Sequence, residues 1–239
     1  MSGRIPFPHG EGFFETLLTR DGLVADLNRH MRRAVRTSQQ LNIPIPHEEE
    51  LRVKIAEELS SSPHSVGRLR ICFMKSGIDI SHREYLSSEL PARVTFAQGT
   101  SISTGEQWKT FPYTERFAIL DQALAWGFDD AIIFNKANEI TETSIANIAL
   151  RIAGEWVTPP ISSGILPGTM RAQAIEDHGV KVRAIHISEI ADVEAGLLLS
   201  SLKIAQLISH IGDYECSIDS DVTRLSSEIA AKLEFHSVG

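Results

Sequence analysis

The sequence predicts a mixed α/β fold of the α+β class, with a small N-terminal α/β domain and a larger C-terminal domain. Strand and helix patterns follow one another in both halves, and a stretch of small and polar residues at 99–112 separates the halves. A chain of 239 residues can bury one large core or two cores in domains of about 100 residues. We expect the small domain at 1–105, an interdomain connector at 106–114 and the large domain at 115–239.

The N-terminal half is predicted to contain three strands and two helices. Residues 12–18 and 67–75 have the β-branched, aromatic and alternating side chains of strands, and 93–98 reads as another strand. The second helix covers about 47–59 and ends at a Ser-Ser-Ser-Pro breaker. The first helix is predicted from an apolar face made of Leu27, Met31, Ala34, Ser38 and Leu41.

The C-terminal half alternates between the same two patterns. Gly127 and Gly179 each follow a helical pattern and mark its end, and Ser188 could cap a short helix. The predicted helices are 115–126, 169–178 and a last amphipathic one that carries Val222, Leu225, Ile229 and Leu233; the predicted strands are 131–134, 146–152, 155–158, 180–187, 197–199 and 205–210.

Charge and hydropathy exclude two classes of partner. A net charge of -8 argues against nucleic-acid binding, which depends on clustered Lys and Arg. No run of 18 apolar residues and no apolar segment of signal-peptide length occurs, so we expect no membrane contact and a cytoplasmic location. Cys72 and Cys216 match neither disulfide nor metal spacing and read as buried or incidental thiols. The histidines are scattered without ligand spacing, so we predict no metal site.

Lys109 is the first residue with a distinctive chemical setting. Taken alone, a lysine is usually a solvated surface residue. The neighbours Trp108, Phe111 and Tyr113 can form an apolar wall, which would lower an ammonium pKa and free an amine for covalent chemistry with an aldehyde.

Glu142 follows Lys109 in a run that reads as a strand. A solvent-facing position on an antiparallel sheet is its ordinary interpretation. Its alternative interpretation is a carboxylate beneath a pyridine ring, where it keeps the ring nitrogen protonated. Asn147 is expected to be a structural hydrogen-bonding residue that holds the turn.

An anion site is predicted where a helix begins after residues 164–168. Free backbone amides at a helix start, together with the helix dipole, suit a phosphate dianion, although Gly and Pro before a helix are common. Arg33 is either an exposed helix charge or a guanidinium that binds the same phosphate. Ser200 and Ser201 either add hydroxyls or only end a strand. An amine, a pyridinium partner and an anion site are what pyridoxal phosphate needs.

These motifs, in this order and spacing, resemble the class IV pyridoxal-phosphate aminotransferases of fold type IV. That family comprises branched-chain aminotransferases, D-amino-acid aminotransferases and aminodeoxychorismate lyases. The resemblance runs from about Gly10 to Ser201. It rests on Gly-Glu-Gly-Phe-Phe-Glu-Thr at 10–16, His-Met-Arg-Arg at 30–33, Lys-Thr-Phe-Pro-Tyr at 109–113, Thr141-Glu142 with Asn147, Thr-Pro-Pro at 158–160, Leu-Pro-Gly-Thr-Met-Arg at 166–171 and Ser200-Ser201.

The resemblance implies a role for each matching residue. Lys109 would bond to the cofactor aldehyde and then shuttle protons, and Glu142 would pair with the pyridine nitrogen. Members are commonly homodimers with the pocket between a small N-terminal and a larger C-terminal domain. The remaining implied contacts are Arg33 to phosphate, Tyr113 near the ring and its 3-oxygen, Thr169 and Met170 through backbone amides to phosphate, Ser201 through its hydroxyl, and Phe14 on the substrate side.

Three departures from the family pattern bear on the substrate. The strands that usually precede residues 14–16 are shortened or missing, Met170 replaces a frequent threonine, and residues 75–82 lack both the Gly/Arg-rich loop of many lyases and the Arg/His arrangement associated with D-amino-acid carboxylates. The first expectation is a lyase that converts 4-amino-4-deoxychorismate to 4-aminobenzoate and pyruvate for folate synthesis. The alternatives are an aminotransferase of branched-chain or other neutral amino acids with a 2-oxo acid acceptor, and a noncatalytic protein that keeps the fold.

Overall fold

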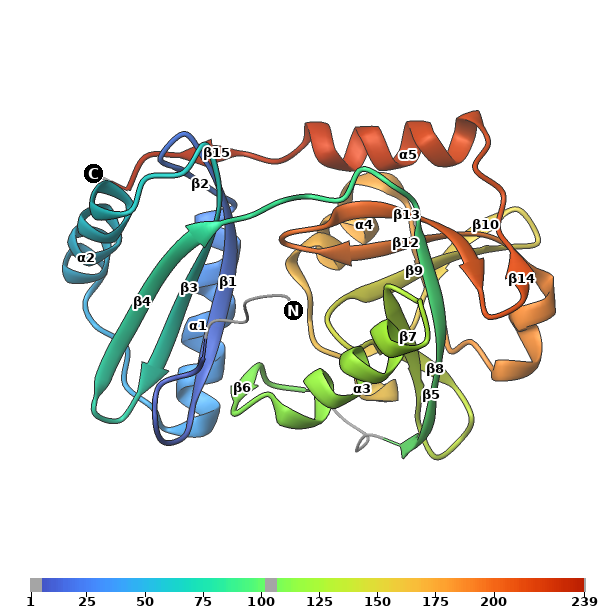
Figure 1. Cartoon of the computed structure of the whole chain (residues 1–239), viewed down its shortest axis with the longest axis horizontal. Helices are drawn as coiled ribbons and strands as arrows, with labels where there is room; N and C mark the ends of the chain where they lie inside the picture. The colour runs from blue at the N-terminus through green and yellow to red at the C-terminus, as the bar shows by residue number, and fades with distance from the viewer. Residues whose placement is uncertain (1–5, 102–106, 239) are drawn as a thin grey trace. The chain divides into compact units, whose positions relative to one another are not determined.

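The computed structural model describes residues 6–101 and 107–238, and the chain divides into two compact units. Both units mix helices with strands, which confirms the predicted fold class (Figure 1). No helix of these described ranges is long and apolar enough to cross a bilayer. Unit 1 is Met1–Leu86, Trp108–Thr114 and Leu233–Gly239; unit 2 is Ser87–Gln107 and Glu115–Lys232.

The units do not follow the expected ranges. Strand β5 (Ala92–Ser101) hydrogen-bonds in parallel to β7 (Asp130–Phe134) and β13 (Ile204–Ile211), so it belongs to unit 2 although it precedes residue 105. Pairing with strands so distant in sequence leaves no local signal. Residues 102–106 of the expected connector lie outside the described part of the chain.

Unit 1 contains a six-stranded sheet with two helices packed against one face. Its order is β15-β2-β1-β3-β4, and β6 pairs with the free end of β1. The β3–β4 hairpin has a strand, β4, that the sequence analysis did not predict. The elements are β1 Gly12–Arg20, β2 Leu23–Ala25, α1 Leu27–Leu41, α2 Glu48–Ser61, β3 Val66–Met74, β4 Gly77–Glu84, β6 Thr110–Phe111 and β15 Phe235–His236.

Helix α1 turns a partly polar face to the sheet. The predicted apolar face holds in part, because Leu27 and Ala34 are buried while Met31, Ser38 and Leu41 are only half-buried. His30, Arg33 and Thr37 are buried instead. The helix is rotated toward these residues because strand β1 places a carboxylate, described below, among the core side chains.

Unit 2 contains a nine-stranded sheet of order β11-β10-β9-β12-β13-β5-β7-β8, with β14 beside β13. Strand β8 is at one edge of this sheet and β9 is near the other, yet the two strands contact each other. The sheet therefore curls around an aliphatic core. Helices α4 and α5 pack against β12 and β13. The elements not yet given are α3 Thr114–Ala125, β8 Ile140–Thr143, β9 Asn147–Ile152, β10 Glu155–Thr158, η1 Ile161–Ser163, α4 Thr169–His178, β11 Lys181–Val182, η2 Ile187–Asp192, β12 Val193–Ser200, β14 Tyr214–Glu215 and α5 Ser220–Ala231.

Two local predictions near η2 differ from the structure. The expected strand at 180–187 is reduced to the two residues of β11. His186, not Ser188, caps η2: its ring accepts from the Ser188 amide, and the Glu189 carboxylate accepts from the His186 amide at 2.8 Å. Helix α4 spans the predicted residues, and Gly179 ends it with a φ of 68°.

Truncating the core of unit 2 should destabilise the protein. Leu150 on β9 is completely buried in the aliphatic core, so Leu150→Ala is expected to lower the free energy of unfolding by about 2–5 kcal/mol. Leu124→Ala on α3 is the control, because Leu124 is 47% exposed and surface truncations usually change stability by less than about 0.5 kcal/mol. Urea titration of both variants measures the difference, and equal midpoints would contradict this account of the core.

Candidate functional site

Lys109 is held against the first strand of unit 1. Its carbonyl accepts a hydrogen bond from the Phe14 amide at 2.9 Å, and β6, which follows it, pairs with β1. A Cβ on Gly12 would lie 2.2 Å from the Phe73 carbonyl oxygen, so only glycine permits this close approach. The Lys109 Nζ atom lies 5.0 Å from the centre of the Phe14 ring, which is within cation–π distance.

The apolar wall predicted beside Lys109 exists with altered membership. Phe14 and Phe111 are buried together, and Tyr113 packs against them. Tyr113 meets the Phe14 ring edge-on at 5.3 Å, and Phe7 stacks on Phe111 at 5.2 Å. Trp108 is not a member of this aromatic cluster as the structure describes it, so β1 and the segment before it supply the remaining rings.

Arg33 is fixed by a buried carboxylate that the sequence analysis did not single out. Arg33 Nε donates to Glu15 Oε1 at 2.8 Å and its Nη2 donates to Oε2 at 2.6 Å. His30 Nδ1 lies 2.6 Å from the same Oε2. Because a carboxylate only accepts, the Nδ1 atom carries the shared proton. Because Arg33 is buried, the interpretation of Arg33 as an exposed helix charge does not hold. Its binding of a phosphate stays a prediction.

The charges in this Glu15–His30–Arg33 triad support one another. Burial alone would raise the pKa of Glu15, but Arg33, with help from His30, lowers it to about 2. Burial lowers the pKa of His30; Glu15 opposes that shift, while Arg33 and Lys109 add to it. The Lys109 charge therefore acts on the triad. A signal was present in the sequence: Glu15 lies between Phe13 and Leu17 on one strand face, so it must point into the core.

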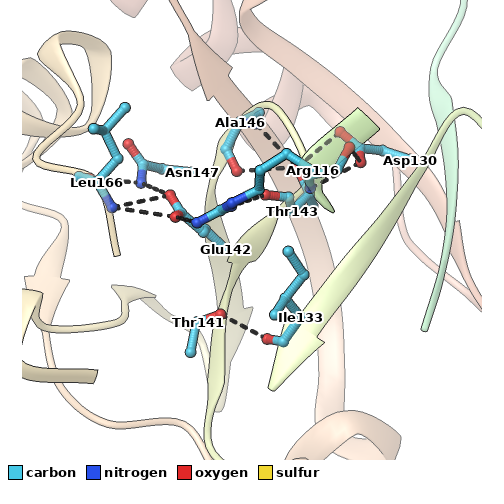
Figure 2. A network of polar contacts seen from close by, with 10 residues as sticks. Arg116, Asp130, Ile133, Thr141, Glu142, Thr143, Ala146, Asn147 and Leu166 are labelled. Atoms are coloured by element: carbon cyan, nitrogen blue, oxygen red, sulfur yellow. Dashed lines mark hydrogen bonds and ion pairs between the residues drawn. The ribbon is translucent and has the colours of Figure 1, made fainter. Parts of the chain in front are cut away.

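Glu142 is the centre of the polar network of unit 2 (Figure 2). It lies on β8 with 3% of its surface exposed, so the solvent-facing interpretation does not hold. Arg116 Nη2 donates to Oε1 at 2.6 Å and Asn147 Nδ2 donates to Oε2 at 2.9 Å. The Leu166 amide is 3.2 Å from both oxygens.

Arg116 is, after Glu15, the second candidate site residue that the sequence analysis missed. It lies in the first turn of α3 and also donates to the Thr143 carbonyl at 3.0 Å. A cation at a helix start interacts unfavourably with the helix dipole. An arginine at this position of the sequence therefore indicates that a nearby carboxylate compensates for it. Asn147 matches its prediction as a structural hydrogen-bonding residue, since its Nδ2 also donates to the Leu166 carbonyl at 3.0 Å.

The turn between β8 and β9 is held by a second buried acid. Asp130 accepts from Thr143 Oγ1 at 2.8 Å, from the Ser144 amide at 3.0 Å and from the Ser144 hydroxyl. Burial raises the pKa of Asp130, and these donors oppose the shift. The network fixes the end of the strand that carries Glu142.

Helix α4 begins beside the Glu142 network with its amides uncapped. Gly168 is the N-cap residue and no side chain caps it, while Thr169 and Met170 are buried. The first amides of a helix have no partner within the helix, so they are available to water or to a bound anion. A Cβ on Gly168 would lie 1.9 Å from Asn147 Oδ1. The Asn147 side chain therefore contacts both sites: its Nδ2 atom binds the Glu142 carboxylate, and its Oδ1 atom lies against Gly168 at the uncapped helix start.

Arg171, one turn into α4, has a structural role. It donates to the Thr158 hydroxyl at 3.2 Å and to the Pro159 carbonyl at 2.7 Å. Burial lowers its pKa to about 10, and Glu142 acts in the opposite direction. These contacts join the start of α4 to the end of β10.

Ser201 lies in the turn that follows β12. The neighbouring Ser200 hydroxyl accepts from the Lys203 amide at 3.1 Å, which closes the turn. Ile204 leaves it with a φ of 59°, a conformation that is rare for β-branched residues and is found where surrounding structure enforces it. Thr169, Met170 and Ser201 all belong to unit 2, as does Glu142, whereas Phe14, Arg33, Lys109 and Tyr113 belong to unit 1.

Removing Arg116 should destabilise unit 2 strongly. Arg116→Met leaves the Glu142 carboxylate buried without its cation, which typically costs about 3–5 kcal/mol. Adding Glu142→Gln removes the uncompensated charge, so the double variant should regain much of the lost stability. Arg224→Met is the control, because Arg224 forms exposed ion pairs that are worth about 0–1 kcal/mol. Urea unfolding of the four proteins tests this, and a double variant no more stable than Arg116→Met would contradict it.

The triad should make unit 1 less stable as the pH falls into the acid range. Because folding lowers the pKa of Glu15 from 4.5 to about 2, its ion pair contributes fully above pH 4.5 and is lost as the pH falls toward 2. Glu15→Gln should therefore be less stable at neutral pH and lose less stability on acidification. Melting temperatures between about pH 3 and pH 7 measure the slopes, with exposed Glu84→Gln as the single-charge control. Parallel slopes for wild type and Glu15→Gln would rule out the assignment.

Comparison with known proteins places this geometry in a family. A curated relative, the bifunctional aminodeoxychorismate lyase / D-amino acid transaminase of Mycobacterium tuberculosis, is 25% identical over 82% of this chain and 80% of its own. A putative 4-amino-4-deoxychorismate lyase from Legionella pneumophila has the same fold, with a TM-score of 0.82 at 22% identity over 96% of both chains. A branched-chain aminotransferase from Thermoproteus uzoniensis does too, with a TM-score of 0.81 at 19% identity over 93% of this chain and 85% of that one. The family model Amino-transferase class IV matches residues 12–211, and the chain belongs to that enzyme family.

Proposed function

We propose that this class IV enzyme binds pyridoxal 5'-phosphate and acts as a 4-amino-4-deoxychorismate lyase, releasing pyruvate and 4-aminobenzoate for folate synthesis. The observation that carries the proposal is the buried Glu142 carboxylate joined through Asn147 to the uncapped start of α4. A fixed anion suits a pyridinium nitrogen and free helix amides suit a phosphate. These residues therefore fit the cofactor at both of its polar ends.

The cofactor, when bound, supplies an electron sink for a carbanion formed next to the substrate nitrogen. Glu142 holds a proton on the pyridine nitrogen, and Arg116 keeps that carboxylate charged and oriented. The amides of Thr169 and Met170 bind the phosphate, with Ser201 adding a hydroxyl. Met170 offers only its backbone there, because its side chain has no hydroxyl.

Unit 1 supplies the reacting amine and further contacts. With the cofactor bound, Lys109 would be the amine that meets its aldehyde, and once free it would take the proton from the substrate ring carbon that bears the nitrogen. The Phe14 ring, within cation–π distance of Lys109 Nζ, and the edge-on Tyr113 shield that amine from water. As the family resemblance implies, Tyr113 would contact the cofactor ring near its 3-oxygen, Phe14 would line the substrate side, and Arg33, held by Glu15, would bind the phosphate.

Lyase chemistry needs nothing further from the protein, because aromatisation of the ring drives the loss of pyruvate. The names of the Mycobacterium and Legionella proteins support this choice. The alternative is an aminotransferase of branched-chain or other neutral amino acids, favoured by the similarity to the Thermoproteus enzyme. Lys109 would then move a proton between the substrate carbon and the cofactor carbon, and a 2-oxo acid would be required.

A noncatalytic role is disfavoured by the network around Glu142. A buried ion pair is weak support for stability, because desolvation offsets most of its attraction. A protein that only preserved the fold would lose little by replacing Glu142 and Arg116 with apolar residues. Retaining both, next to an uncapped helix start, is what a charged ligand requires.

We further propose that the enzyme is a homodimer, as the family resemblance implies, and that it works in the cytoplasm. Cys72 and Cys216 are both buried free thiols, which suits a reducing compartment. The substrate is a small-molecule amine. Sedimentation of the holoprotein at micromolar concentration measures the subunit number directly.

The lyase proposal predicts pyruvate release without any acceptor. Holoprotein mixed with aminodeoxychorismate should yield pyruvate and 4-aminobenzoate, and Lys109→Ala should lower kcat by at least about 100-fold, the contribution of a positioned acid–base group. It should also lose the visible absorbance band that borohydride abolishes. Lys54→Ala on α2, an exposed lysine, is the matched control and should retain both properties.

The outcomes separate the candidate functions. Turnover of leucine only when 2-oxoglutarate is present, with no pyruvate formed from aminodeoxychorismate, would select the aminotransferase. A protein that takes up no pyridoxal phosphate and stays colourless would select the noncatalytic role.

A further inference from the structure

Strand β3 turns a row of polar residues away from the helices of unit 1. Leu69, Ile71 and Phe73 pack with α1 and α2 in the core of this unit. Because side chains alternate along a strand, the residues that alternate with them point to the opposite face of the sheet. Those residues are Arg68, Arg70 and Cys72.

The same face carries Lys109. Cys72 is paired with Phe14 across β1 and β3, and the two belong to one aromatic cluster. The Phe14 ring is the one that lies 5.0 Å from Lys109 Nζ. Along β3, Arg70 is two residues from Cys72 and Arg68 is four residues from it. These separations correspond to about 7 Å and 13 Å from the Cys72–Phe14 pair beside Lys109.

Strand β4 extends this row with matching residues. The Cα partners are Arg70 with Ser81 and Arg68 with Arg83, and directly paired residues share a face. Arg68 Nε and Ser81 Oγ are both buried atoms for which the described residues provide no hydrogen-bond partner. Arg70 is engaged with the N-terminal segment, since it donates to the Pro6 carbonyl at 2.5 Å and covers the Phe7 ring.

The charges around Arg68 do not compensate one another. Burial lowers the pKa of Arg68, and the nearby charges of Arg70 and Arg83 lower it further. Tyr85 acts in the opposite direction, and no carboxylate is among the groups that act on Arg68. Three guanidinium groups lie on this sheet face, and Asp79, the Cα partner of Cys72, acts on Arg70 from the same face. In a chain of net charge -8, the excess of guanidinium groups forms a local positive field that attracts an anion.

We propose that Arg68 and Ser81 form the carboxylate-binding end of the substrate site, and that they select an amine bearing a further carboxylate on the far side of its ring. The inference rests on the proposed function and deepens it by naming the substrate class. A guanidinium fork binds a carboxylate through two parallel hydrogen bonds, and the Ser81 hydroxyl donates a third. A neutral branched-chain amino acid has no second carboxylate to place there.

The test compares two ligands that differ only in this carboxylate. Calorimetric titration of the holoprotein with 4-aminobenzoate and with aniline should show at least about tenfold tighter binding of 4-aminobenzoate, as expected for a charge-assisted hydrogen-bonded pair. Arg68→Gln should abolish the difference, Arg68→Lys should keep part of it, and Ser81→Ala should reduce it. Arg52→Gln on α2, an exposed arginine, is the matched control and should retain it.

Kinetics supply the second readout. Arg68→Gln should raise KM for aminodeoxychorismate by about tenfold or more with little change in kcat, because a remote carboxylate contact is uniform binding. Circular dichroism and the melting temperature show whether each variant is folded. If Arg68→Gln does not fold, the same KM and binding measurements are made on Arg68→Lys. Unchanged binding and KM in folded Arg68 variants would overturn this inference while leaving the lyase intact. Absence of pyruvate release with the binding difference preserved would instead overturn the lyase.

Discussion

The ion pair between Glu142 and Arg116 is the constraint that organises the candidate site of unit 2. A carboxylate with 3% exposure is tolerable only when its charge is balanced and its oxygens are hydrogen-bonded. Meeting that need brings in the start of α3 through Arg116, the start of β9 through Asn147 and the loop before α4 through the Leu166 amide. The uncapped end of α4 is thereby fixed relative to the carboxylate.

Unit 1 uses a buried acid in the same way. Glu15 lies between core side chains of β1 and binds Arg33 with both oxygens, so the guanidinium cannot turn without breaking two charge-assisted bonds. Burial lowers the pKa of His30, which disfavours a further positive charge in the triad beside Lys109. In each unit, a side chain that the family resemblance assigns to the cofactor is oriented by a buried partner of opposite charge. Glu15 orients Arg33 in unit 1, and Arg116 orients Glu142 in unit 2.

Sequence reasoning succeeded where the signal is local. The alternation at residues 12–18 and the helix Thr169–His178 were predictable because period and end signals lie within one element or directly beside it. Arg116, the partners of Glu15 and the place of β5 were not, since each depends on a contact between segments that are far apart in sequence. The position of Glu142 was predictable as a motif, but its burial was decided by α3 and by the loop before α4.

The residues proposed to hold the cofactor do not by themselves select the reaction. Lys109 and Glu142 would serve a lyase and an aminotransferase equally, because each moves or holds a proton that both reactions share. Discrimination must therefore come from groups that contact parts of the substrate remote from the reacting carbon. A hydrogen bond between charged groups contributes about 1.5–3 kcal/mol, or roughly 10- to 150-fold in affinity. Arg68 and Ser81, on the Lys109 face, can supply it, because an aliphatic side chain placed against them would leave Arg68 Nε and Ser81 Oγ buried and unpaired.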